Sequence, residues 1–173
     1  MRFFIAACLL LSAPVSAKIV AADGHGFALH QSVDVAAPPA KAWAALLRVQ
    51  DWWSKDHTYS GKAERLSLDP RPGGCFCERL DGGGGVEHMR VALIQPGQRL
   101  VLTGALGPLL LEGTAGVMDL TVAKAPGGSR ITMDYRVAGF GGDNGSDLAP
   151  KVDAMLAEQL KRLVAAAERP ARR

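Results

Sequence analysis

The stretch PKVDAMLAEQLKRLVAAAE, residues 150–168, decides the fold, because its apolar side chains recur with the period of an α-helix. Proline is suited to the first turn of a helix, so Pro150 marks the predicted start. Charged side chains occupy the other sides of the helix. The apolar side carries Val152, Met155, Leu156, Leu160, Leu163, Val164 and Ala167. A helix of this length must bury its apolar stripe, and the preceding chain has to supply the partner.

The preceding chain predicts an antiparallel β-sheet as that partner. Residues 27–35 alternate between apolar and polar side chains, which is the pattern of a half-buried strand. More strand-like segments follow, separated by short breaks rich in glycine and proline, and consecutive strands joined in this way favour hairpins. These segments are residues 62–68, 74–80, 86–94, 98–104, 115–123 and 129–138.

Two short helices are predicted after the first strand. Ala-Ala-Pro-Pro at residues 36–39 opens the first of them. Its apolar stripe is Trp43, Leu46 and Leu47. Asp51 can cap the second, which carries Trp52 and Trp53. The predicted class is therefore α+β, with a curved antiparallel sheet of about seven strands wrapped around one long C-terminal helix.

This order of elements resembles the START and polyketide cyclase/dehydrase and lipid-transport superfamily (SRPBCC), whose fold is the helix-grip. VDVAAPPAKAWAAL, residues 33–46, resembles the first strand and helix of that superfamily. DWWS and TYSGKAERLSLDPRPGGCFCERL, within residues 51–80, resemble the Trp and GG-aromatic-x-E passage of bacterial homologues of the heat-shock-protein ATPase activator. PGQRLVLTGALGPL (96–109) and GSRITMDYRV (128–137) are similar to its later strands. The resemblance covers about residues 27–168 and implies a cavity between sheet and helix for an apolar ligand.

The N-terminus predicts export. Residues 1–17 have the form of a secretory signal peptide, with an apolar run at residues 3–11 and a Val-Ser-Ala cleavage site ending at Ala17. Cleavage after Ala22 is the alternative. The apolar run is too short to span a membrane, so no stable membrane insertion is expected after cleavage. The predicted location is periplasmic or secreted.

Three further segments complete the predicted organisation. Residues 18–26 are expected to be a loose lead-in, residues 27–168 the folded domain, and residues 169–173 a basic tail. A hydrophobic content of 48% and a charged content of 21% are ordinary for a globular protein. Cleavage after Ala17 removes one arginine and no acid from the 20 Lys and Arg and 17 Asp and Glu, which leaves a formal net charge of 19 − 17 = +2. This charge is too weak to indicate nucleic acid or an anionic membrane as a partner.

The motif Cys75-Phe76-Cys77 could be a pair of free thiols, a disulfide or part of a metal or redox site. The predicted hairpin around it indicates which way the cysteines face. With residues 81–85 as the loop, Glu78 lies opposite His88 and Cys77 opposite Met89. One face of the hairpin then carries Cys75, Cys77, Met89, Val91 and Leu93, and the other carries Phe76, Glu78, His88 and Arg90. This sorting predicts that the cysteines face the core and that the charged face is exposed, with Phe76 as the misfit.

That placement favours packed free thiols, because free cysteine behaves as a small buried hydrophobe. Residues two apart in a regular strand have Cα atoms ~6.6 Å apart, near the upper limit for a disulfide. A disulfide and a metal or redox site remain as alternatives. A metal site would want a histidine beside the thiols, and His88 is predicted to face away from them.

No catalytic constellation, metal site or cofactor motif is recognised. His25, His30, His57 and His88 show no metal-ligand spacing. His57 follows the tryptophan pair near the presumed mouth of the cavity, so it is a candidate polar site, with a solvated loop histidine as the alternative. His88 is expected to form a surface pair with Glu78, which would contribute little stability. Asp119 and Asp134 are expected on the exposed face of the sheet.

The break between two strands at residues 104–113 is unusually apolar. It contains Leu106, Leu109, Leu110 and Leu111. Either the loop folds down as a lid on the core, or it acts as a gate or a dimer contact.

The function predicted from these features is an exported protein that binds a small apolar or lipid-like ligand in a cavity between sheet and long helix. The cavity is expected to be lined by Trp53, Tyr59, Cys77, Met89, Leu102, Leu109, Met118, Tyr135 and Met155. One alternative is a cyclase or dehydratase that uses His57, Tyr59 or Tyr135 as a proton donor. Another is a protein-interaction module that uses residues 106–111.

Overall fold

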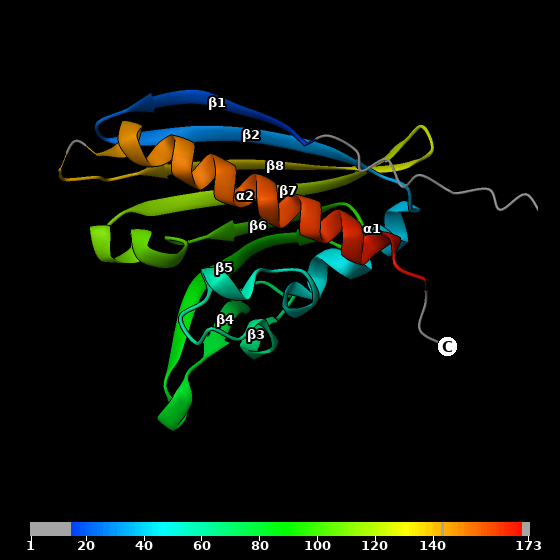
Figure 1. Ribbon diagram of the computed structural model, residues 1–173, viewed down its shortest axis with the longest axis horizontal. Coiled ribbons are helices and arrows are strands. Elements are labelled where there is room, and N and C mark those ends of the chain that lie inside the picture. The colour runs from blue at the N-terminus through cyan, green and yellow to red at the C-terminus, as the bar shows by residue number, and fades with distance from the viewer. Residues whose placement is uncertain (1–14, 143, 171–173) are drawn as a thin grey trace, which may run out of the picture.

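The computed structural model describes residues 15–142 and 144–170. Within this part, one antiparallel sheet of eight strands curves around a long helix, in the order β1-β2-β8-β7-β6-β5-β4-β3 (Figure 1). The strands are β1 (Ser16–Asp23), β2 (Gly26–Val35), β3 (Leu66–Leu68), β4 (Cys75–Arg79), β5 (Gly85–Gln95), β6 (Arg99–Thr103), β7 (Ala115–Ala125) and β8 (Gly128–Ala138). The predicted α+β helix-grip architecture is confirmed.

The long helix is the element predicted from its apolar stripe. The two α-helices are α1 (Pro39–Leu47) and α2 (Gly145–Glu168), and the 3₁₀ turns are η1 (Val49–Asp51), η2 (Lys55–His57), η3 (Ala63–Arg65), η4 (Asp81–Gly83) and η5 (Gly107–Glu112). α2 begins ahead of Pro150, at Gly145. A Cβ atom on Gly145 would lie 2.6 Å from the carbonyl oxygen of Asp23, so only glycine fits this approach to the β1–β2 turn.

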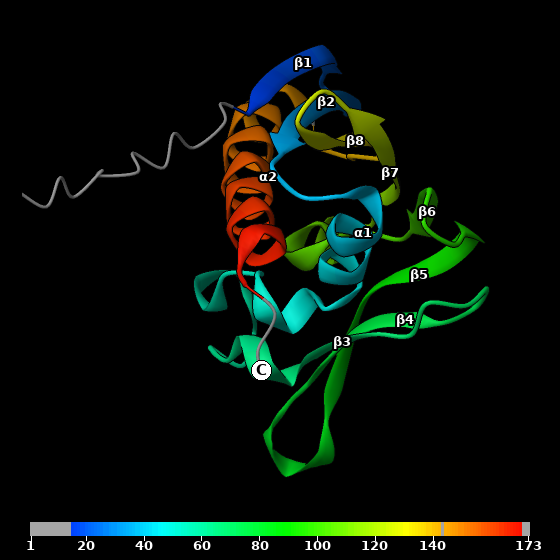
Figure 2. The same cartoon turned by 90° about the vertical axis from the view of Figure 1, so that its right-hand side faces the viewer.

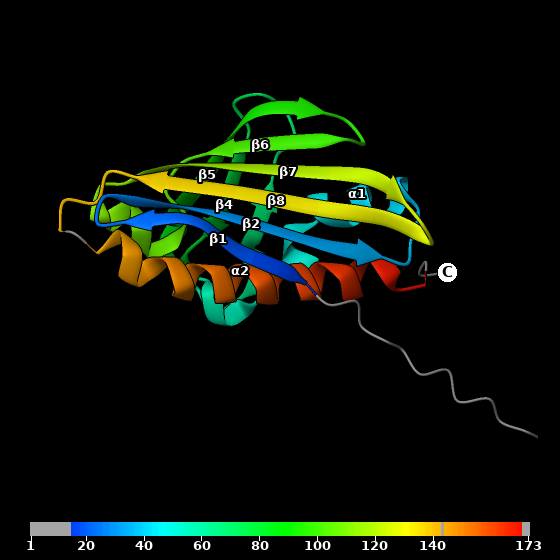
Figure 3. The same ribbon diagram turned by 90° about the horizontal axis from the view of Figure 1, so that it is seen from above.

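α2 lies across the inner face of the sheet and packs on β2, β1 and α1 (Figure 3). Leu156, Leu160 and Leu163 on its apolar stripe are fully buried. Two polar contacts fix the helix in place. Gln31 Nε2 on β2 donates to both the carbonyl and the carboxylate oxygen of Asp153, at 2.7 Å each. Arg162 Nε on the helix donates to the carbonyl of Trp52 at 2.9 Å.

The N-terminal segment differs from the prediction. Residues 18–26 were expected to be loose, but β1 occupies Ser16–Asp23 and pairs antiparallel with β2. Its residues are all exposed, so the burial pattern that marks a strand in a sequence is missing here. Residues 1–14 of the predicted signal peptide and residues 171–173 of the predicted tail lie outside the described residues.

The segment that carries the tryptophans is less helical than predicted. The second short helix is the single turn η1, and Trp52 and Trp53 follow it rather than lying within it. Both indole rings are buried, and their NH groups donate to backbone carbonyls. The strand predicted at residues 62–68 is confined to β3, because the turn η3 precedes it.

The β4–β5 hairpin contradicts the predicted register. Glu78 pairs with Val86 and Cys77 with Glu87, whereas Phe76 pairs with Met89. The register shift leaves His88 as an extra residue in β5, which is the arrangement of a β-bulge.

The bulge reverses the predicted faces of β4. Phe76, Glu78, His88 and Met89 are buried, and β4 turns Cys75 and Cys77 to the other side. The prediction that the cysteines face the core and the Glu78–His88 pair faces solvent was therefore wrong. Phe76, the misfit of the predicted face, is a core residue. A bulge changes which residues share a face, and strict alternation in the sequence cannot reveal it.

The two cysteines form a disulfide, so the prediction of packed free thiols was also wrong. Their Cα atoms are 5.3 Å apart, closer than the ~6.6 Å of a regular strand and within the usual range for a disulfide. The hairpin is irregular at this point, since the register shifts between Phe76 and Cys77. The register shift accounts for the inverted faces, and the short Cα separation lets the two sulfurs bond.

Candidate functional site

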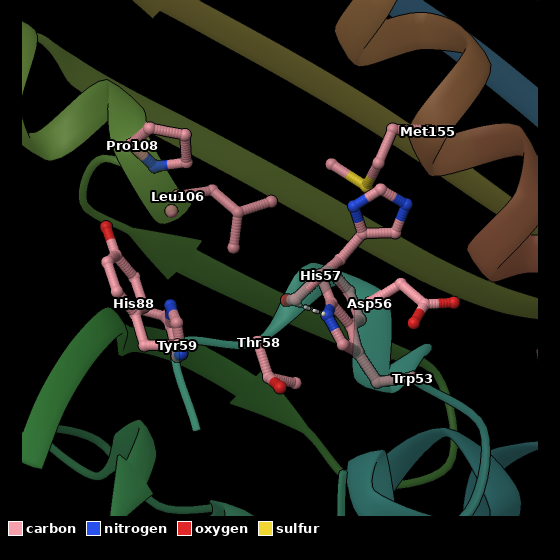
Figure 4. A pocket seen from close by; sticks show the side chains of 10 residues that line it. Trp53, Asp56, His57, Thr58, Tyr59, His88, Leu106, Pro108 and Met155 are labelled. Carbon is pink, nitrogen blue, oxygen red and sulfur yellow. Dashed lines mark hydrogen bonds between the residues drawn. The ribbon is translucent and has the colours of Figure 1, made fainter. Parts of the chain in front are cut away.

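A cavity of about 260 Å³, called the main cavity below, lies where the Trp53–Tyr59 segment, the start of η5 and α2 approach one another (Figure 4). A larger cavity of about 470 Å³ lies between α1 and the C-terminal end of α2, but charged side chains make up much of its lining. The lining of the main cavity is Trp53, Asp56, His57, Thr58, Tyr59, His88, Leu106, Gly107, Pro108 and Met155. Apolar groups come from the loop, from η5 and from the helix, whereas His88 comes from the bulge in β5. The main cavity therefore depends on four elements that are far apart in the sequence.

A second cavity, of about 220 Å³, adjoins the main cavity and extends along α2. The two share the lining residues His57, Leu106, Pro108 and Met155. The second is completed by Leu109 from η5 and by Leu148, Lys151 and Val152 from the helix. Together they form a largely apolar groove between η5 and α2, which we call the η5–α2 groove.

The region deeper between sheet and helix is filled. A cavity of about 20 Å³ remains there, and a cavity needs about 10–15 Å³ to hold one water molecule. Leu102 and Met118 border it, together with Trp52, Trp53 and Phe76. The space for a ligand is therefore at the edge of the sheet rather than at its centre.

The structure distributes the predicted lining residues over several places. Trp53, Tyr59, Met155 and the candidate polar residue His57 line the main cavity, and Leu109 lines the adjoining one. Leu102 and Met118 lie in the packed interior, and Met89 and Tyr135 are buried without lining any of these cavities. Cys77 was placed wrongly, because β4 turns it away from the core.

The loop at residues 106–111 combines features of both predicted alternatives. Leu106 and Leu109 are buried and face the groove, as a lid would. Leu110 and Leu111 are 49% and 83% exposed. The hydroxyl of Tyr135 accepts a hydrogen bond from the Leu106 backbone N–H at 3.3 Å, and burial raises the pKa of this phenol to about 12. Tyr135 thus anchors the start of η5 from within the core.

His57 lies at the boundary between the two cavities. Its backbone carbonyl accepts a hydrogen bond of 2.9 Å from the indole Nε1 of Trp53, drawn as a dashed line in Figure 4. Its Nε2 lies 3.9 Å from Glu158 Oε2 on α2, and both side chains are partly exposed. His57 is therefore a polar group at the mouth of the groove.

Glu78 and His88 form a buried pair beside the main cavity. Their side chains are almost completely inaccessible, and His88 Nε2 lies 3.0 Å from Glu78 Oε2. The predicted contact between these two residues is therefore present, but in the interior rather than on the surface. Sequence reasoning missed both as site residues. The signal that could have found them is Phe76, an aromatic residue on the face that was assigned to charged residues.

The Glu78 carboxylate holds the loop that borders the cavity. It accepts hydrogen bonds from the backbone N–H of Tyr59 at 3.0 Å and from that of Ser60. Burial by itself raises the pKa of this carboxyl, but the bonds from Ser60, Tyr59 and His88 outweigh burial and hold the pKa below its usual value. Glu78 is therefore ionised at neutral pH and fixes the loop beside His88.

The His88 imidazole contacts two aromatic rings in addition to its hydrogen bond at Nε2. Its ring centroid lies 5.1 Å from that of Phe76 and 5.9 Å from that of Tyr59, beside which it lies in Figure 4. Burial lowers the pKa of His88, although the hydrogen bond to Glu78 opposes this effect. His88 Nδ1 is buried and has no hydrogen-bond partner among the described residues.

Comparison with known proteins agrees with the fold. Residues 27–168 match the family model described as polyketide cyclase / dehydrase and lipid transport. The chain belongs to this family. The family supports a ligand-binding fold, and the η5–α2 groove offers room for a largely apolar ligand. No protein of curated function matches the chain significantly.

Solved structures show the same fold at low sequence identity. An uncharacterised protein from Rhizobium leguminosarum is 19% identical, with a TM-score of 0.62, over 90% of this chain and 99% of that one. A protein from Mesorhizobium loti is 18% identical, with a TM-score of 0.59, over 84% and 99%. Ara h 8.0201 is 14% identical, with a TM-score of 0.57, over 82% and 97%. At these identities, the likeness concerns the fold alone.

Two properties of the described residues bear on membranes and metals. Neither α1 nor α2 has the length and hydropathy of a membrane-spanning helix, as far as the chain is described. Among residues 15–142 and 144–170, no three His, Cys, Asp or Glu side chains come together as a metal site would require.

Proposed function

We propose that this protein binds a small, largely apolar ligand in the η5–α2 groove. The observation that carries the proposal is the main cavity of about 260 Å³, with Trp53, Leu106, Pro108 and Met155 in its lining. With the adjoining cavity it reaches the range of about 300–1,000 Å³ that is typical of ligand sites. Membership of a family that includes lipid-transport proteins supports the same reading.

The energetics of such a groove favour modest affinity. Burying about 200 Å² of apolar ligand surface at about 25 cal/mol/Å² gives roughly 5 kcal/mol before the costs of association. The polar groups on the lining are few, and they would orient the ligand rather than supply most of the free energy.

Native mass spectrometry of the purified protein and titration with the neutral fluorophore N-phenyl-1-naphthylamine test the proposal. We expect saturable binding, and we expect Met155→Trp to abolish it by filling the groove. Val117→Trp is the matched control, because Val117 is an exposed residue of β7 outside these cavities. A protein with no co-purifying ligand and no binding of the fluorophore would contradict the proposal.

We also propose that the chain acts outside the cytoplasm. The N-terminal pattern of residues 1–17 and the Cys75–Cys77 disulfide both support this, because disulfides persist in oxidising compartments. Cleavage after Ala17 would leave most of β1 paired with β2, whereas cleavage after Ala22 would remove almost all of it. Expression of the full chain in a Gram-negative host, followed by fractionation and intact-mass measurement, should yield a periplasmic protein that begins at Lys18.

A further inference from the structure

We propose that His88 Nδ1 is an acceptor site for the hydroxyl group of an otherwise apolar ligand, a phenol or an alcohol, bound in the main cavity. The proposal rests on the proposed binding function and narrows it to a class of ligand. It assigns to the buried Glu78–His88 pair the role of selecting that ligand rather than merely filling the core.

The tautomer of His88 follows from the contacts of Glu78. The ionised carboxylate accepts hydrogen bonds from two backbone N–H groups, and a carboxylate can only accept. The short contact with His88 therefore requires a proton on Nε2. A neutral imidazole with a proton on Nε2 carries a lone pair on Nδ1. Glu78 is thus a positioning residue that prepares Nδ1 as an acceptor.

The ring borders the main cavity, so a partner for Nδ1, which itself lies beneath the surface, would come from that cavity. The ring contacts both Phe76 and Tyr59, and Nε2 is hydrogen-bonded to Glu78. His88 also lines the main cavity, while its Nδ1 has no partner among the described residues. A buried polar atom without a partner is costly, and such atoms in native proteins call for a functional explanation. A donor on a bound ligand would satisfy it.

The chemistry of the lining selects a neutral hydroxyl. A ligand carboxylate has no proton to donate, and it would meet the carboxyl group of Asp56, which also lines the cavity. Transferring an ammonium group into the apolar groove would cost much of its hydration. A phenol or alcohol donates one hydrogen bond to Nδ1 and presents its apolar remainder to Trp53, Leu106 and Met155.

Two probes, of which only one carries a hydroxyl hydrogen-bond donor, test the proposal. 2-Naphthol and 2-methoxynaphthalene are titrated by calorimetry into the wild-type protein and into His88→Phe. We expect the wild-type protein to prefer 2-naphthol by about tenfold, the effect of one hydrogen bond, and His88→Phe to bind both about equally. His30→Phe is the matched control, because His30 lies on β2 outside these cavities and should leave the preference intact.

The outcomes separate this proposal from the binding function. Equal wild-type affinity for both probes, or a preference that survives His88→Phe, overturns the role of His88 and leaves the groove as a binding site. Failure of both probes to bind the wild-type protein contradicts the proposed function itself. Nitrogen-15 NMR of the histidine rings gives a reading that needs no substitution. A proton on Nδ1 of His88 overturns the proposal. An unprotonated Nδ1 supports it if its nitrogen-15 resonance shifts on addition of 2-naphthol and does not shift on addition of 2-methoxynaphthalene.

Discussion

Strands β2, β8 and β7 pair without a break in register along their length, whereas the β4–β5 hairpin at the other side of the sheet contains a bulge and a disulfide. In the regular part, inward side chains are apolar apart from Gln31 and Ser129, and charged side chains pair on the outer face. The outer pairs are Asp34–Arg130, Asp119–Arg99 and Asp134–His30, so the expected exposed positions of Asp119 and Asp134 are confirmed.

In the irregular part, an ionised carboxylate and an imidazole face inward. Figure 2 shows this hairpin extending away from α2, beside the loops that form the cavity. The regular part packs against α2 through β2, and the irregular part contributes His88 to the lining of the main cavity. Irregular sheet geometry next to a binding site is a common device for redirecting side chains.

The largest expected loss of stability comes from a substitution in the packing of α2 on the regular part of the sheet. Leu160→Ala removes a fully buried side chain at the contact between α2 and the sheet, so the free energy of unfolding should fall by about 2–5 kcal/mol. Urea denaturation measures the change. Leu111→Ala is the matched control, because an exposed leucine should alter stability by less than about 0.5 kcal/mol. Equal effects of the two substitutions would show that α2 does not stabilise the fold in this way.

A smaller effect is expected in the irregular part. Glu78→Gln keeps the shape of the side chain but replaces one acceptor oxygen with a donor, so one N–H group loses its partner. The expected loss of unfolding free energy is about 1–3 kcal/mol, together with faster hydrogen exchange at Tyr59 and Ser60. Glu87→Gln, on the same hairpin but exposed, should cost less than about 0.5 kcal/mol. Unchanged exchange at both amides would contradict the role of Glu78 in holding the loop.

The disulfide is expected to contribute less to the free energy of unfolding than the Glu78 contacts do. It closes a very short loop, for which the chain-entropy estimate is roughly 1–2 kcal/mol. The double variant Cys75→Ser/Cys77→Ser should lose this amount in urea denaturation and should still bind N-phenyl-1-naphthylamine, because the cysteines are not part of the groove lining. The double variant also serves as the control for a reductant. Reduction should destabilise the wild-type protein and leave the stability of the double variant unchanged.

The smallest expected change in stability comes from lowering the pH. The pKa of His88 is lower in the folded protein than its ordinary 6.5, so the unfolded chain binds the proton first and stability should decline as the pH falls below about 6.5. The pKa of Glu78 is also lowered, from 4.5, so a second decline should begin below about 4.5. His88→Phe should remove the first decline, as measured by urea denaturation across this range. A first decline that persists in this variant would assign it to another group.

Much of the fold was accessible from the sequence because its elements repeat simple patterns. The alternation in residues 27–35 and the helical stripe of residues 150–168 correspond to β2 and to most of α2. β1 was missed because its side chains are all exposed, so burial left no pattern in it. The hairpin was misread because alternation assumes regular pairing, and one extra residue at His88 breaks that assumption.

The candidate site was accessible only in part. Trp53, Tyr59, His57 and Met155 were predicted near a cavity and do line the main one. Leu102 and Met118 were predicted from the same reasoning and lie in packed interior. Whether an inward-facing side chain meets a cavity or another side chain depends on how closely the elements approach, and a sequence pattern carries no such distance.

The sequence by itself determined the class of fold, the order of most elements and the stripe that α2 buries, because burial imposes periods on the chain that can be read directly. Only the tertiary structure decided the redox state of Cys75 and Cys77 and the inward position of Glu78 and His88. The inward pair accompanies a bulge in β5 and the loop at Tyr59 and Ser60, which contacts Glu78 from another part of the chain. The disulfide accompanies a Cα separation that is shorter than in a regular strand. A local pattern records which face a regular strand buries, but it does not record where the strand departs from regularity.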